Sequence, residues 1–145
     1  MFALMTRSKE LRFRLLRVSL LFCGLTWSAS LFGVFVSWDA AVWALEGFGA
    51  KPIAYDPMLD YWLRMAAGAF GLVGIGYLLL ALNPRRIVTI LPWAGWLMVV
   101  EGIVLAWHGF RLGLPPFPFY ADISACFVGG GAILALRSAA EPAKQ

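Results

Sequence analysis

The chain has 145 residues, of which 61% are hydrophobic and only 14% are charged. Soluble domains carry about 25% charged residues, so this composition excludes an ordinary soluble domain and leaves too few polar residues for a separate soluble unit. The formal net charge is +4, and the length predicts one compact unit, a single integral membrane domain over residues 1–145.

The first predicted span follows a basic N-terminal segment. Residues 1–17 hold five basic side chains and one acid, and the apolar run Val18–Val36 has about the ~20 residues that cross a hydrocarbon core. A basic segment before an apolar run is also typical of a signal peptide. This run is longer than the usual ~7–15 residues of a signal peptide, and Trp27 interrupts a simple cleavage pattern. We therefore expect an uncleaved transmembrane helix over about 16–38.

A connector of moderate length leads to the second span. The sequence predicts a short helix over Ala40–Glu46, ended by Gly47 and Gly49. Tryptophan favours the boundary between lipid and water, so we expect this short helix to lie in the membrane interface.

The second predicted span covers about 58–82. Asp60 and Arg64 lie four residues apart with the acid first, which favours an ion pair on one face of the helix. Further along, glycines recur at three-residue steps, and small residues let another helix approach closely within lipid. Two interpretations remain open: close packing within one chain, or the seam of a dimer. The glycines are Gly68, Gly71 and Gly74.

The third predicted span, about 87–111, follows a tight turn over Asn83–Arg86. Pro92 in its first turns predicts a mild kink. The span holds three ionisable side chains, each costly inside a membrane and therefore expected to have a partner or a function. These are Glu101, His108 and Arg111.

The fourth predicted span, about 119–137, follows the stiff turn Gly113–Pro118. Cys23 and Cys126 lie in apolar segments, so we expect small core residues rather than a disulfide. One histidine cannot build a histidine-based metal site, and no metal is assigned. The predicted fold class is an all-α membrane protein with four transmembrane helices in an up-down bundle.

The basic residues predict the orientation. Four spans place both termini on one side, and nine of the twelve Lys and Arg residues lie on that side. Basic residues favour the cytoplasmic side, which predicts a multi-pass protein of the cell membrane with both termini in the cytoplasm. Since orientation accounts for the positive charge, the expected partner is the lipid bilayer and not a nucleic acid. Only Lys51, Arg64 and Arg111 lie on the opposite side.

Four ionisable side chains from three helices form the candidate ligand-binding site: Arg64, Glu101, His108 and Asp122. Helical side chains lean towards their own N-terminus, so Arg64 and Glu101 lean apart, and Asp122 is the better-matched partner of Arg64. Glu101 lies about 15 Å below Arg111 at 1.5 Å per residue and has no obvious partner. A structural polar layer and a small-molecule or proton-linked site both remain open.

Three segments within Asp60–Arg137 carry a resemblance: DYWLRMAAGAFGLVGIGYLLLAL, NPRR and EGIVLAWHGFRLGLPPFPFYAD. They resemble the uncharacterised four-helix bacterial membrane proteins of the DUF4345 family, which are similar to the DoxX-like superfamily in size and helix pattern. The shared features are Arg64, the glycine-rich interior of its helix, and a Gly–x–x–Arg close of the third helix. Here Gly109 and Arg111 are only two residues apart, which departs from that pattern. The resemblance implies a four-helix protein of the bacterial inner membrane and no activity.

Three functions remain open. The first is a non-enzymatic membrane protein that acts as a homo-oligomer or as an accessory subunit of a larger complex, because the sequence has no catalytic signature. The second is a binding or transport-type protein for a small apolar or acidic ligand at an outer-side pocket formed by the four site residues. The third is a membrane enzyme of redox or isomerase type with Glu101 and His108 as acid and base, which requires both side chains to reach one cavity. No cofactor is assigned.

Overall fold

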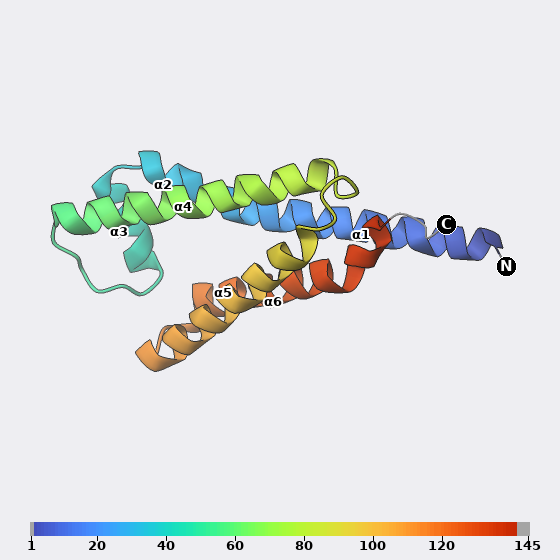
Figure 1. Cartoon of the computed structure of the whole chain (residues 1–145). Coiled ribbons are helices and arrows are strands. Elements are labelled where there is room, and N and C mark those ends of the chain that lie inside the picture. The colour runs from blue at the N-terminus through green and yellow to red at the C-terminus, as the bar shows by residue number, and fades with distance from the viewer. Residues whose placement is uncertain (1, 142–145) are drawn as a thin grey trace.

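The computed structural model describes residues 2–141, and all the regular secondary structure in that range is helical (Figure 1). Four helical stretches are long and apolar enough to cross a membrane, so the predicted all-α fold with four spans is confirmed. The stretches are Arg7–Phe35, Pro57–Leu82, Leu91–Leu112 and Pro116–Ala140. The elements are α1 (Phe2–Ser28), η1 (Ala29–Leu31), α2 (Phe32–Phe35), α3 (Trp38–Gly47), α4 (Pro57–Leu82), α5 (Leu91–Leu112), α6 (Pro116–Leu136) and η2 (Arg137–Ala140).

The first span is longer than predicted and is not one regular helix. Its helix α1 begins at Phe2 rather than near residue 16, because Arg, Lys, Glu and Leu in the basic segment are themselves good helix formers. After Ser28 the chain tightens into the 3-10 turn η1 and resumes as the single turn α2. Val36 is extended (ψ 149°) and ends the span. The short helix predicted in the connector is confirmed as α3.

Proline and glycine place the later helix ends. Residues 84–90 form turns, so α5 starts at Leu91 and not at 87. Pro92 therefore lies in the first turn of α5, where its missing N–H is not needed, and it starts the helix instead of kinking it. Gly113 is left-handed (φ 62°) and ends α5. In α6 the backbone of Phe117 is non-helical, so the continuous part of this helix begins after Phe117. This agrees with the predicted start near residue 119.

The four long helices form two antiparallel hairpins. α1 packs along α4, α5 packs along α6, and α6 also contacts α1 and so joins the hairpins. Figure 1 shows both ends of the described chain at the same end of the molecule, and from there the α5–α6 hairpin diverges from the α1–α4 hairpin. α4 and α5 do not pack along each other. The long helices of the two hairpins therefore pack together near the termini and diverge from there. At the other end the residue after α3 contacts the second hairpin, because the Phe48 and Phe117 rings lie 5.8 Å apart.

The buried core lies at the end near the termini. Leu16 and Leu20 of α1, Leu91 of α5 and Ile133 of α6 have no exposed surface. Nearby, the buried Tyr77 hydroxyl donates to the Ala94 carbonyl at 2.6 Å and ties α4 to α5. Its hydrogen bond matches the rule that buried polar groups have partners.

Glycines bring the helix backbones together. A Cβ added at Gly74 of α4 would overlap the backbone of Ser28 in α1, and one at Gly71 would overlap the Leu31 side chain. In the second hairpin, a Cβ at Gly130 would lie 2.8 Å from the Gly95 carbonyl oxygen. Close packing within one chain is thus confirmed for Gly71 and Gly74, as small residues permit between helices in lipid.

Basic side chains of α1 close the C-terminal ends of two neighbouring helices. Arg17 Nε donates to the Ala81 carbonyl in the last turn of α4 at 3.0 Å. Arg12 Nη2 donates to the Ala135 carbonyl near the end of α6, also at 3.0 Å. The last carbonyls of a helix have no partner within it and carry partial negative charge, so a guanidinium satisfies both needs.

Candidate functional site

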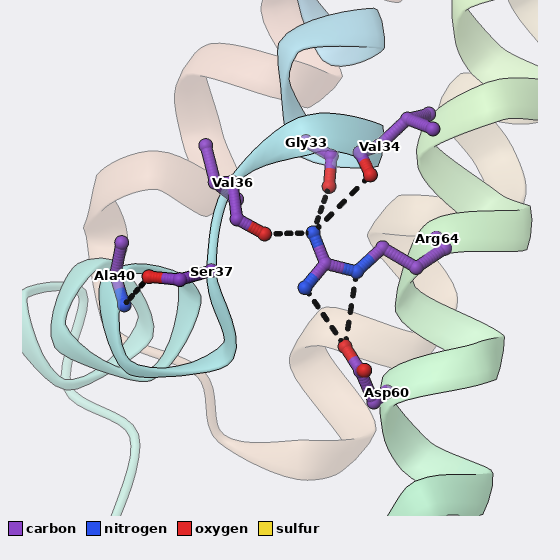
Figure 2. A network of polar contacts seen from close by, with 7 residues as sticks. All are labelled: Gly33, Val34, Val36, Ser37, Ala40, Asp60 and Arg64. Carbon is purple, nitrogen blue, oxygen red and sulfur yellow. Dashed lines mark hydrogen bonds and ion pairs between the residues drawn. The ribbon is translucent and has the colours of Figure 1, made fainter.

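Arg64 joins α4 to the end of the first span (Figure 2). Its Nε and Nη2 atoms contact Asp60 Oδ1 at 3.0 and 2.9 Å, which confirms the predicted pair. Its Nη1 atom donates to the Gly33 carbonyl at 2.9 Å, to that of Val34 at 3.4 Å and to that of Val36. Arg64 therefore seals the carbonyl end of α2, as Arg17 seals that of α4.

The expected pair of Arg64 with Asp122 is wrong. All three guanidinium nitrogens of Arg64 bond to Asp60 or to carbonyls of the first span, and Asp122 lies on α6 in the other hairpin. The first span ends in an extended residue, and Ser37 then caps α3 by accepting from the Ala40 N–H at 3.3 Å (Figure 2). That break leaves carbonyls unpaired beside Arg64, and they take its donors.

A polar cavity of about 220 Å³ lies between the two hairpins. Residues from all four membrane-length helices line it, including both Glu101 of α5 and Asp122 of α6. α1 and η1 each add a hydroxyl group, and α1 and α4 each add an aromatic ring. The lining residues are Thr26, Trp27, Ser30, Phe70, Glu101, Leu105, Asp122, Ala125 and Cys126.

An apolar groove of about 440 Å³ adjoins this cavity where α4 and α5 do not pack together. The cavity and the groove share Trp27, Phe70 and Glu101. The two rings meet edge to face with centroids 5.1 Å apart. Glu101 is thus the charged residue at the junction of a polar compartment with an apolar one.

The Glu101 side chain is half-buried and makes no hydrogen bond or ion pair within the range 7–141. The hydroxyl groups in the cavity donate elsewhere. Thr26 donates to the Phe22 carbonyl at 2.9 Å, and Ser30 donates to the Trp27 carbonyl at 2.6 Å. The cavity therefore offers oxygen acceptors, and its hydroxyl protons are already used.

His108 lines a third cavity of about 480 Å³, under α3 and beside the α5–α6 turn. This cavity shares Leu105 and Asp122 with the polar cavity but does not include Glu101. Glu101 and His108 therefore line different cavities, and the acid–base pair required by the enzyme hypothesis is not assembled.

The four predicted site residues thus separate. Glu101 and Asp122 meet in the polar cavity, His108 lies in the next one, and Arg64 lines none of the three. Within residues 2–141, no group of three His, Cys, Asp or Glu side chains is placed to hold a metal ion. The sequence reasoning missed four lining residues of the polar cavity, although hydroxyl and aromatic groups in apolar spans were a usable signal. They are Thr26, Trp27, Ser30 and Phe70.

No protein-family model, no curated protein and no solved structure matches this chain. The resemblance to the DUF4345 family therefore stays a prediction.

Proposed function

We propose that the protein is a non-enzymatic membrane protein that binds a small amphipathic molecule in the cleft between its two hairpins. The observation that supports this most is Glu101, which lies without a protein partner where the polar cavity joins the apolar groove. Ligand sites are typically concave, mostly apolar and equipped with a few polar groups, with volumes of about 300–1,000 Å³. The joined compartments fit that description.

Filling the apolar groove tests this function. Gly76 lines the groove, and a Cβ added there meets nothing within 4 Å, so Gly76→Leu extends a side chain from an unobstructed position in the groove. Native mass spectrometry of the protein released from detergent is expected to show a small-molecule adduct on the wild type and a much weaker one on this variant.

The matched control is Gly131→Leu. Gly131 also has nothing within 4 Å of an added Cβ, but it lines none of the three cavities. This variant is expected to keep the adduct. Equal adducts on all three proteins, or none on the wild type, would contradict binding in the cleft.

A second candidate function is a homo-oligomer or an accessory subunit of a larger membrane complex. The observation that favours it is the outer surface of α5, where Trp93, Trp96 and Trp107 are 72%, 55% and 68% exposed. A partner helix seated against α5 would cover them. The same mass spectra distinguish the functions, because this candidate predicts a multiple of the chain mass, or a bound partner chain, in place of a small-molecule adduct.

The proposed location is the cell membrane, with both termini in the cytoplasm. Two observations support it: the four apolar spans, and the eight basic residues among those described that lie at the end of the molecule near the termini. In this orientation the end at which the hairpins diverge faces outwards, and the lipid bilayer is the immediate partner of the exposed apolar surface.

A further inference from the structure

We infer that the ligand of the cleft is a lipophilic cation whose charge lies beside Glu101 and Asp122 and whose apolar part lies in the α4–α5 groove. This inference rests on the proposed function and adds the chemical class of the ligand. It also reverses the sign of the acidic ligand that the sequence suggested, because the arginine expected to bind that ligand is used elsewhere.

The charge of the lining carries the first step. Among the described residues that line the polar cavity and the groove there are two carboxylates and no Lys, Arg or His. Both carboxylates belong to the polar cavity. Arg64 makes all its contacts with Asp60 and with backbone carbonyls of the first span. A ligand in this cavity therefore meets two acidic side chains and no basic one.

The two carboxylates line the same cavity from neighbouring helices. A Cβ added at Gly102 would lie 3.0 Å from the Cys126 Cβ, so α5 and α6 pack tightly beside Glu101. Asp122 is one helical turn from Cys126, about 6 Å along the axis. Like charges in one cavity repel each other, and a cation bound there relieves that repulsion.

Hydrogen-bond direction carries the second step. The Thr26 and Ser30 hydroxyls donate to backbone carbonyls, so towards the cavity they offer lone pairs. An ammonium group supplies donors or positive charge to all four oxygen-bearing side chains. A carboxylate or phosphate ligand would find acceptors only.

The aromatic rings carry the third step. Trp27 and Phe70 line both compartments beside Glu101 and pack edge to face at 5.1 Å. Cations bind aromatic faces, best of all those of tryptophan, and quaternary ammonium ligands are recognised in this way. An unpaired carboxylate in a hydrocarbon environment is costly, so a bound cation also stabilises the protein itself.

The test uses two probes of nearly the same shape and opposite charge, tetraphenylphosphonium and tetraphenylborate. Binding of each to the full chain in lipid nanodiscs is measured by equilibrium dialysis, with empty nanodiscs subtracted. The phosphonium is expected to bind saturably and the borate not to bind above the lipid background. Glu101→Gln is expected to weaken phosphonium binding about tenfold or more, since the electrostatic attraction between the carboxylate and the cation in a partly desolvated site is lost.

The matched control is Glu46→Gln, which removes an exposed carboxylate of α3 that lines none of the three cavities. It is expected to leave phosphonium binding unchanged. Should Glu101→Gln fail to fold, a carbodiimide supplies the second measurement on the wild type. Modification of Glu101, located by peptide mass spectrometry, is expected to be slowed by the phosphonium and not by the borate.

The outcomes separate the two proposals. Equal binding of both probes overturns the cationic ligand. So does phosphonium binding that Glu101→Gln leaves unchanged, or Glu101 modification that the phosphonium does not slow. If Gly76→Leu still weakens binding of either probe in that case, the cleft remains a binding site and the proposed function stands. If neither probe binds and no adduct is seen, both proposals fail.

Discussion

Arg64 and Arg17 perform the same task at opposite ends of one helical hairpin. Arg17 of α1 donates to the last turn of α4, and Arg64 near the start of α4 donates to the last carbonyls of the first span. Because α1 and α4 are antiparallel, each guanidinium reaches the partner's C-terminal end, where partial negative charge gathers. The two bonds fix how the helices are aligned along each other.

Only half of this arrangement is predictable from the sequence. The Asp60–Arg64 pair follows from the spacing of four residues. The carbonyl partners do not, because they exist only where the first span breaks after Ser28 and ends at Val36. No proline marks that break, and its small residues also fit a continuous helix.

Removing the Arg64 side-chain charge should therefore destabilise the hairpin. Arg64→Gln is expected to cost about 2 kcal/mol, because an ion pair and several carbonyl bonds in a part-buried site are lost. Thermal unfolding in detergent, followed by circular dichroism, measures the change. Arg111→Gln is the control, because Arg111 is exposed in the last turn of α5. A similar loss in both variants would show that Arg64 acts only as one more surface charge.

For Glu101, too, the residue is recognisable from the sequence, but its surroundings depend on how the helices pack. An acid in the middle of an apolar span is visible at once, since such residues are rare and costly there. Its surroundings are not visible, because Thr26, Ser30 and Phe70 lie on other helices and reach the cavity through the angle between the hairpins. The four site residues were predicted from their depth along the helices alone, which does not include the angle between the hairpins.

At the scale of elements, the glycine spacing in α4 predicts close packing but not which glycines make it. Gly74 meets the backbone of α1, whereas Gly76, two residues on, faces the open groove. Two residues on a helix are about 200° apart, so they point to nearly opposite sides. The sequence does not state which side of α4 faces α1, and this determines the role of each glycine.

The pair Gly74 and Gly76 makes a sharp comparison. Gly76→Ala is expected to leave stability unchanged or to raise it by up to about 1 kcal/mol, because alanine favours helix and meets nothing there. Gly74→Ala is expected to lose about 2 kcal/mol, because the new methyl overlaps the Ser28 backbone, which cannot move without separating α1 from α4. Unfolding temperatures of the two variants in one detergent measure this. Equal behaviour would contradict the close approach of these helices.

At the scale of the whole molecule, the long helices of the two hairpins pack together near the termini and diverge from there. The core residues close the end near the termini, and beside the Tyr77–Ala94 bond α4 and α5 leave a groove between them. Hydropathy predicts the four spans well, since every lipid-exposed backbone group must be bonded within a helix. It does not predict the divergence of the hairpins, which depends on where glycines permit contact. The cleft is therefore a property of the assembled chain.

The orientation of this cleft depends on the topology, which two introduced cysteines test. Cys23 and Cys126 are both buried, so the wild type is expected to give little background with a membrane-impermeant maleimide. Lys51→Cys, in the connector after α3, is expected to be labelled on intact cells. Arg86→Cys, in the turn after α4, is expected to be labelled only after the membrane is opened. The reason is that basic residues such as the pair at 85–86 resist transfer across the membrane. The reverse pattern would place the termini outside, and the polar cavity would then be reached from the cytoplasm.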